Sequence, residues 1–204
     1  MTKQEFASRL QNACAAVTAA EQELTEIDSR FGDADHGLTM SKIAKAISAA
    51  AGESEGGIQA MLDDAAMAVM VLNGGSAVPL WNTWLDGLQE EAPEGNEIDT
   101  AGIQAIFAKA LKALSDMSGA KVGDKTMMDA LYPAVTAMQE CASDDVETIL
   151  KAGADAAQKG AEATVQMKAN FGRARNYGEK SVGHADSGAS SWACMFGAFA
   201  AALA

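Results

Sequence analysis

The chain has 204 residues, of which 49% are hydrophobic but only 5% aromatic, and its formal net charge is −13. This length suits one domain with a sizeable core, and a composition dominated by Ala, Leu and Met among the apolar residues favours helices over sheets. The negative charge argues against a general nucleic-acid or anionic-membrane surface. A polyanionic ligand would have to be bound locally, through a cation or through backbone N–H groups.

The three cysteines, Cys14, Cys141 and Cys194, lie far apart and are odd in number, so they form neither a disulfide framework nor a metal-binding pair. The first residues, MTKQEFASRL, do not follow the pattern of a signal peptide. No apolar run reaches the length of a membrane span. We therefore expect a cytoplasmic protein without membrane contact.

Helical periodicity begins at the N-terminus. Thr2 and Glu5 form a capping-box pattern, and apolar residues from Phe6 onward recur at helical spacing, which predicts a helix from residue 3 to about residue 28. No segment alternates with a period of two for long enough to predict a strand. Pro133 should kink or interrupt the helix in which it lies. Further helices are expected at 38–51, 57–72, 79–91, 99–117, 126–141, 144–170 and 188–203.

We therefore predict an all-α fold, a single-domain eight-helix antiparallel up-and-down bundle that spans residues 1–204. The chemically unusual loops are the first, third, fifth and seventh. In an up-and-down bundle the odd-numbered loops lie at the same end, so these loops should form a ligand pocket at one rim. They comprise residues 28–39, 73–79, 118–127 and 171–190.

The first of these loops, in IDSRFGDADHGLTM, holds three carboxylates and a histidine between glycines. Asp28, Asp33 and Asp35 repel one another unless a positive group lies between them, and aspartate oxygens suit a hard cation such as magnesium. An EF-hand counted from Asp33 fails, because Leu38 replaces its glycine and Ala44 replaces its final glutamate. Zinc would need more His or Cys. The remaining alternative is a solvated acidic turn.

Two glycine-rich loops could bind an anion, but their sequence patterns are less specific than that of the acidic turn. NGGSAVPL, residues 73–80, is a glycine turn that leads into a helix, so it is either a phosphate turn or a plain connection. GAKVGDKT, residues 119–126, is not a P-loop, because only three residues separate its glycines and Asp124 precedes Lys125. It is either a ligand loop or a helix cap.

The last loop, FGRARNYGEKSVGHADSGASS, is long and locally basic in an acidic chain. It contains Arg173 and His184, while the other histidine, His36, lies in the acidic turn. Long loops in compact bundles are usually functional, and its DSGASS end can cap a helix and present N–H groups to a ligand. Together the four loops predict a site for a magnesium-bound nucleotide or phosphate on an all-helical rim.

These motifs resemble the L subunit of dihydroxyacetone kinases, which is equivalent to the nucleotide-binding C-terminal domain of the fused kinases. The resemblance covers nearly the whole chain, in the order DSRFGDADHG, NGGSAVPLWNT, GDKTMMDALYPAV and GRARNYGEKSVGHADSGASS. It implies an eight-helix barrel with the nucleotide at one end. It also implies transfer of phosphate from a Mg-bound nucleotide to a small ketose, which is held on a separate K-type subunit. The donor is either exchangeable ATP or a tightly held ADP that a phosphotransferase-system protein rephosphorylates.

By position, the resemblance implies that Asp28, Asp33 and Asp35 hold two magnesium ions. His36 and Arg173 are expected near the transferring phosphate, as catalytic residues. The residues that the resemblance assigns to nucleotide binding are His36, Gly37, Leu38, Thr39, Ser76, Ala77, Gly119, Met127, Arg173, Asp186, Ser187 and Gly188.

Two positions depart from the family pattern. The phosphate turn usually reads GGASGPL, whereas here it reads GGSAVPL, with Val78 in place of a glycine, and Ser187 replaces a proline in the later DPG. Val78 restricts the backbone of the turn. An alternative is therefore a nucleotide-binding regulatory module that has lost catalysis and acts through protein–protein interaction. A helical scaffold without ligand is a third reading.

Overall fold

The computed structural model describes residues 1–202, and within them it contains nine α-helices and two 3-10 helices. The β pairing in these residues is an isolated bridge between Thr2 and Glu97. The helices are α1 (Lys3–Ala19), α2 (Glu21–Asp28), α3 (His36–Glu53), α4 (Ile58–Met70), α5 (Ala77–Glu90), α6 (Thr100–Ser118), α7 (Met128–Glu140), α8 (Val146–Ala163) and α9 (Ser187–Ala200), with the 3-10 helices η1 (Thr164–Gln166) and η2 (Ala174–Ser181) between α8 and α9.

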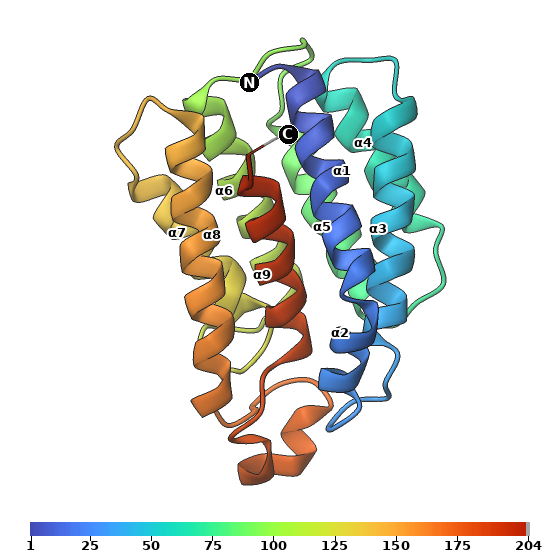
Figure 1. The fold of residues 1–204 in the computed structure, drawn as a ribbon, viewed down its shortest axis with the longest axis vertical. Coiled ribbons are helices and arrows are strands. Elements are labelled where there is room, and N and C mark those ends of the chain that lie inside the picture. Colours follow the sequence, from blue (N-terminus) through green and yellow to red (C-terminus); the bar gives the residue numbers. More distant parts are fainter. Residues whose placement is uncertain (203–204) are drawn as a thin grey trace.

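The helices form a closed ring (Figure 1). From α3 onward each helix packs against the next in the chain, α1 packs on α3, and α9 returns to pack on α1. The short helix α2 continues α1 downward and packs on α3 and α9. Counting α1 and α2 as one member, the ring has the predicted eight members, and the all-α barrel is confirmed.

Most helix boundaries lie within about two residues of the prediction, and three helices differ in a way that bears on the fold. The expected helix 3–28 breaks at Ala20, whose ψ of 5° lies off the helical value, and this break lets α2 lean onto α3. The expected helix 144–170 ends at Ala163, and the predicted loop 171–190 contains η2. The last expected helix, 188–203, ends at Ala200, and residue 203 lies outside the described residues.

Pro133 does not interrupt its helix, so that part of the prediction is wrong. Helix α7 continues through it from Met128 to Glu140. A proline cannot donate to the carbonyl four residues earlier, here that of Asp129. Gly160 of α8 packs against this carbonyl so closely that a Cβ would lie 2.0 Å from its oxygen. The neighbouring helix therefore covers the carbonyl that the proline leaves free.

Five of the eleven aromatic residues form one cluster in the core. Trp81 and Trp192 stack with ring centroids 3.9 Å apart, and Trp84 meets Trp192 edge-on at 5.0 Å. Phe107 and Phe196 extend this group. All five are buried, so α5, α6 and α9 are joined by large, geometrically specific contacts.

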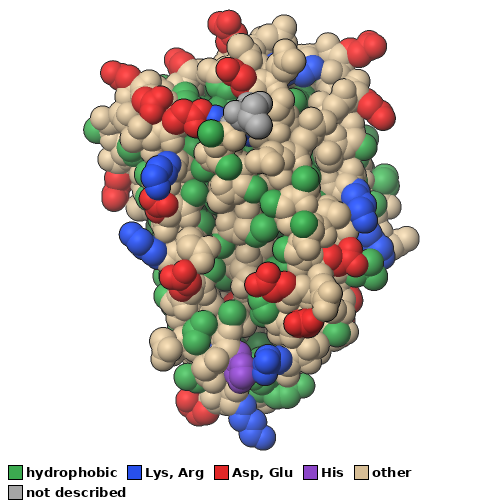
Figure 2. Space-filling model, viewed as in Figure 1, with side chains coloured by type: hydrophobic (Ala, Val, Ile, Leu, Met, Phe, Trp, Pro, Cys, Tyr) green, Lys and Arg blue, Asp and Glu red, His purple; other side chains and the backbone are tan. Residues whose placement is uncertain are grey.

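The charged side chains are mostly acidic, with 28 Asp and Glu against 15 Lys and Arg. On the face shown in Figure 2, acidic side chains are scattered, whereas a histidine lies beside basic side chains at the lower end. The orange-red segment between α8 and α9 reaches this end in Figure 1. Among residues 1–202, no helix combines the length and the apolar character that crossing a membrane requires.

Candidate functional site

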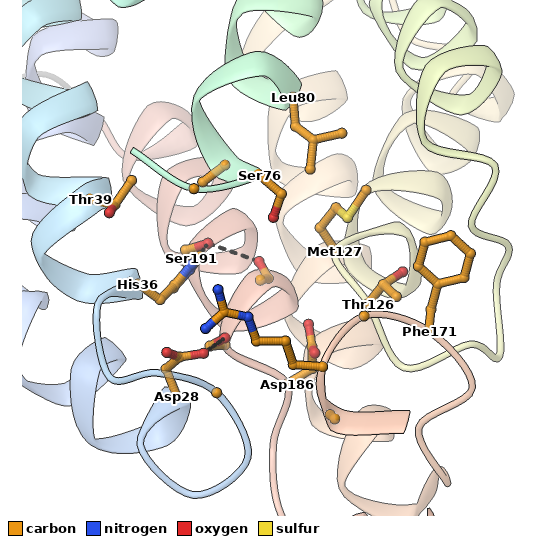
Figure 3. A pocket seen from close by; sticks show the side chains of 18 of the residues that line it. Asp28, His36, Thr39, Ser76, Leu80, Thr126, Met127, Phe171, Asp186 and Ser191 are labelled. Carbon is orange, nitrogen blue, oxygen red and sulfur yellow. Dashed lines mark hydrogen bonds between the residues drawn. The ribbon is translucent and has the colours of Figure 1, made fainter. Parts of the chain in front are cut away.

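A cavity of about 460 Å³ opens at the end of the barrel where the α2–α3, α4–α5, α6–α7 and α8–α9 connections meet (Figure 3). Its volume is that of a typical small-molecule site. All four loops selected from the sequence contribute to its wall. The prediction that they converge on one rim is therefore confirmed.

The acidic turn forms one side of the cavity. Asp28 is the last residue of α2, Asp35 is the N-cap of α3, and one oxygen from each of Asp28, Asp33 and Asp35 lies within 4.8 Å of the others. Gly32 makes room for this arrangement, because a Cβ there would lie 2.3 Å from an Asp28 oxygen. Ala34 at the tip has φ +59°, an uncommon conformation for a residue with a side chain. The turn is thus shaped around the carboxylates.

The carboxylates fit a hard divalent cation. Asp28 Oδ1 accepts a hydrogen bond from Ser187 Oγ at 3.2 Å, but Asp28 Oδ2 is buried and has no hydrogen-bond partner. A buried carboxylate oxygen without a partner is costly, and a cation would satisfy it. Arg173 forms an ion pair with Asp33 across the cavity mouth. The guanidinium thus supplies one positive charge to the cluster.

Asp33 and Asp35 do not titrate alike. Loss of water around Asp35 raises its pKa, and the charges of Asp33 and Asp28 raise it further. Partial burial also disfavours the charged form of Asp33, but the hydrogen bond and charge of Arg173 outweigh it, so the pKa of Asp33 is lowered. A proton and a metal ion compete for the same oxygens. Metal affinity should therefore fall as the pH drops through the raised pKa of Asp35.

In metal-free protein, we expect Asp35 to protonate at a higher pH than a free aspartate and Asp33 at a lower pH, because only Asp33 pairs directly with Arg173. Carboxyl-carbon NMR titration in EDTA measures both pKa values. In Asp33→Asn the pKa of Asp35 should move down, since one neighbouring negative charge is removed. A parent in which Asp33 protonates at a higher pH than Asp35 would contradict this assignment.

His36 is the first residue of α3 and points into the cavity (Figure 3). Its Nε2 lies 3.1 Å from Ser191 Oγ, and that hydroxyl donates to the carbonyl of Gly188 at 2.9 Å. Because the hydroxyl proton is used there, Nε2 acts as the donor to Ser191. Burial lowers the pKa of His36, although Asp28 and Asp35 oppose the shift. The imidazole is therefore held neutral and in one orientation.

The α4–α5 turn presents a helix N-terminus to the cavity. Gly75, Ser76 and Ala77 line the wall, and the Ser76 side chain makes no capping bond to α5. The first N–H groups of a helix carry partial positive charge and suit an anion. Val78 is buried and does not line the cavity. Its side chain therefore faces the core and leaves the turn open to the cavity.

Helix α9 brings a second N-terminus to the same wall. Asp186 caps it by accepting a hydrogen bond from Ala189 N–H at 2.8 Å. Burial raises the pKa of Asp186 to about 7, which the capping hydrogen bond opposes and the charge of Asp129 reinforces. Gly188 packs against Met127 of the α6–α7 loop, since a Cβ there would lie 3.3 Å from its backbone nitrogen.

Apolar side chains form the remaining wall. Leu80, Met127 and Phe171 lie to one side of the polar cluster in Figure 3. The stacked Trp81 and Trp192 also line the cavity. A polar, charged end beside an apolar surface suits a ligand with an anionic group and a flat or apolar portion.

The chain is similar to known proteins over most of its length. A sequence model of the DAK2 domain family matches residues 30–201.

The chain belongs to the DAK2 domain family.

Two relatives of this DAK2 domain have a similar length. It is 31% identical to the "PEP-dependent dihydroxyacetone kinase 2, ADP-binding subunit DhaL" of Listeria innocua, over 93% of this chain and 90% of the relative. It is also 31% identical to the "PEP-dependent dihydroxyacetone kinase, ADP-binding subunit DhaL" of Escherichia coli, over 87% of each chain. The predicted relationship to the dihydroxyacetone kinase L subunit is therefore confirmed.

Two longer proteins contain a similar region. The D-erythrulose kinase of Mycolicibacterium smegmatis is 37% identical over 87% of this chain, which spans 32% of that protein. The crystal structure of the dihydroxyacetone kinase from C. freundii in complex with AMP-PNP and Mg2+ superposes with a TM-score of 0.75 and 26% identity. That match covers 95% of this chain and 33% of the kinase. The DAK2 domain thus spans about a third of these two relatives.

Most residues selected from the sequence line the cavity of the DAK2 domain, but three do not. Gly37 is buried against α2, where a Cβ would lie 2.0 Å from the carbonyl oxygen of Glu21. Leu38 is exposed to solvent, and Gly119 ends α6 with φ +67°. The lining residues among those selected are Asp28, Asp33, Asp35, His36, Thr39, Ser76, Ala77, Met127, Arg173, Asp186, Ser187 and Gly188.

Sequence reasoning missed the apolar wall and several polar neighbours. The sequence signals for the apolar residues were weak, because a Trp or Met at helical spacing usually indicates a buried core position and not a ligand site. Ser191, the partner of His36, lies four residues after Ser187 and therefore on the same face of α9. The cavity residues that the sequence did not single out include Phe31, Leu80, Trp81, Met117, Lys125, Thr126, Phe171, Ser191 and Trp192.

Proposed function

We propose that this chain binds a magnesium nucleotide in the rim cavity and serves as the nucleotide-binding subunit of a kinase that phosphorylates a small ketose held on a separate K-type subunit. The observation that carries the proposal is the convergence of Asp28, Asp33 and Asp35 on one point, with Asp28 Oδ2 buried and unpartnered. The names of the relatives supply the substrate class, because they describe ADP-binding subunits of dihydroxyacetone kinases and an erythrulose kinase.

The residues divide the work by their positions. The three aspartates would hold two magnesium ions, which neutralise phosphate charge and align the phosphates. The N-termini of α5 and α9 face the cavity with N–H groups that can bind phosphate oxygens. Leu80, Met127 and Phe171 provide an apolar surface for the base.

His36 and Arg173 are the proposed catalytic residues. His36 is neutral, and its Nε2–H is used on Ser191, so its Nδ1 carries a lone pair that can accept a hydrogen bond or a proton at the reacting centre. Arg173 is exposed at the mouth and paired with Asp33. Its planar guanidinium suits the equatorial oxygens of a phosphoryl group in transit.

Native mass spectrometry before and after EDTA tests this function. We expect a bound mass equal to ADP plus two magnesium ions, or its appearance when Mg–ADP is added, and its loss on chelation. Retention of the nucleotide through long dialysis favours a resident ADP that a phosphotransferase-system protein rephosphorylates, whereas rapid exchange favours ATP as the donor. A protein that binds no nucleotide in magnesium would overturn the proposal.

The same preparation tests catalysis. With a matched K-type subunit, the parent should phosphorylate dihydroxyacetone or erythrulose. Intact Mg–ADP binding without any ketose phosphorylation would instead favour the alternative function, a regulatory module without catalysis, which the unusual GGSAVPL turn suggests. Val78 itself lies outside the cavity wall, which supports the kinase assignment.

A further inference from the structure

Lys125, in the loop between α6 and α7, is buried and binds four backbone carbonyls. Only 2% of the surface of Lys125 is exposed to solvent. Its Nζ donates to the carbonyl oxygens of Thr164 at 2.8 Å, Met167 at 3.1 Å, Ser181 at 2.7 Å and His184 at 2.6 Å. None of these acceptors belongs to its own loop.

The geometry requires an ammonium group. Four carbonyl oxygens converge on one nitrogen, and an ammonium offers three N–H donors, whereas a neutral amine offers two and turns a lone pair toward the oxygens. Among the described residues, no carboxylate forms a salt bridge with Nζ. The carbonyls therefore form a cation site that the protein fills with its own lysine.

The four carbonyls come from both ends of one segment, residues 164–186. This segment leaves α8, passes through η1 and η2, and returns to the cap of α9. It carries Arg173 and Asp186, both in the cavity wall. Lys125 Nζ therefore binds the segment near its start and near its end. It acts together with hydrogen bonds that the amides of Ala169, Gly183 and Asp186 donate across the same two ends.

The loop that carries Lys125 is itself held in an unusual conformation. Lys125 has φ +59°, which is rare for a residue with a side chain. The carboxylate of Asp129 accepts hydrogen bonds from Gly123 N–H at 2.5 Å and Thr126 N–H at 2.8 Å, on either side of Lys125. This turn directs the lysine side chain toward segment 164–186.

We propose that Lys125 is a positioning residue whose ammonium clamps segment 164–186 against the α6–α7 loop and so holds the wall that carries Arg173 and Asp186. The inference rests on the proposed function, because the wall has a role only if the cavity binds a ligand. Lys125 also lines the cavity, but its Nζ donors are directed at four backbone carbonyls, so the ammonium is not available to the ligand.

Hydrogen exchange of the ligand-free protein tests the clamp directly. In Lys125→Met the carbonyls lose their donor, and we expect exchange at the amides of Ala169, Gly183 and Asp186 to accelerate by at least about tenfold. Amides in α1, α3 and α4 should keep their parent rates. The matched control is Lys121→Met, an exposed lysine of the same loop, which should leave the segment unchanged. Unchanged exchange in the segment of Lys125→Met would overturn the proposal.

A second variant keeps the test decisive if Lys125→Met does not fold. Lys125→Ala leaves space for an n-propylammonium ion, which reproduces the deleted atoms. We expect this ion to restore slow exchange in segment 164–186, whereas tetramethylammonium, which has no N–H donor, should not. Equal effects of the two ions, or no effect of either, would contradict a role for the N–H donors.

Nucleotide affinity separates the clamp from the proposed function. Lys125→Met should bind Mg–ADP at least about tenfold more weakly, and n-propylammonium should restore the affinity of Lys125→Ala. A parent that binds no nucleotide would overturn the proposed function, while the exchange result would still decide the clamp. A parent and a Lys125→Met variant with equal affinity would show that the positioning role is wrong.

Discussion

Replacing Asp35 by alanine is expected to weaken Mg–ADP binding by about 100-fold or more, which corresponds to about 3 kcal/mol. Asp35 supplies one of three carboxylate oxygens that lie within 4.8 Å of one another. Without it, the two remaining carboxylates offer a cation fewer ligand oxygens and one negative charge less. Isothermal titration calorimetry with Mg–ADP measures the change in Kd.

The same variant should keep its helical circular dichroism in EDTA, and its melting temperature should not fall. Asp35 is exposed and has like charges beside it, so its removal relieves repulsion. Asp64→Ala, an exposed aspartate on α4 outside the cluster, is the matched control and should bind as the parent does. If Asp35→Ala bound Mg–ADP as tightly as the parent, the metal assignment would be wrong.

Arg173→Met should change two measurable properties in opposite directions. Removing the guanidinium from Asp33 takes away a competing positive charge, so Mg2+ without nucleotide should bind a few-fold more tightly. Phosphoryl transfer to a ketose, assayed with a K-type subunit, should fall about 100-fold to 1000-fold, because a donor to the transferring phosphate is lost. A purely structural role for Arg173 would not produce this opposition.

Arg175→Met is the matched control for this prediction. Arg175 is exposed in the same segment and forms no ion pair among the described residues. It should leave both magnesium affinity and transfer near the parent values. Transfer at the parent rate in Arg173→Met would show that Arg173 is not catalytic and serves only to neutralise Asp33.

Local patterns were sufficient to predict the helices and the rim. Capping boxes, apolar periodicity and glycine-rich separators act over a few residues, so they can be read without tertiary information. The convergence of the four loops followed from the helix count and the antiparallel connectivity. The acidic turn was predictable for the same reason, because Asp33 and Asp35 are two residues apart and Asp28 ends the preceding helix.

The errors concern positions where distant segments decide the outcome. The break at Ala20 has no proline or glycine to announce it, and it serves the packing of α2 on α3. Pro133 was expected to kink or interrupt α7, yet the helix continues through it, and Gly160 of another helix covers the freed carbonyl. Gly37, which the resemblance assigns to the nucleotide, does not line the cavity, and its small size lets α3 approach Glu21 of α2. Its nucleotide contact stays a prediction.

Sequence alone thus determined the helical class, the barrel connectivity and the cluster of carboxylates, because each depends on neighbours close in the chain. Tertiary structure alone decided which side chains turn inward. The contact of His36 with Ser191 spans 155 residues, and the lysine of GDKT reaches carbonyls 39 to 59 residues away. Such contacts depend on how the ring closes and on the left-handed backbone of Lys125, and neither leaves a periodic or compositional signal in the sequence.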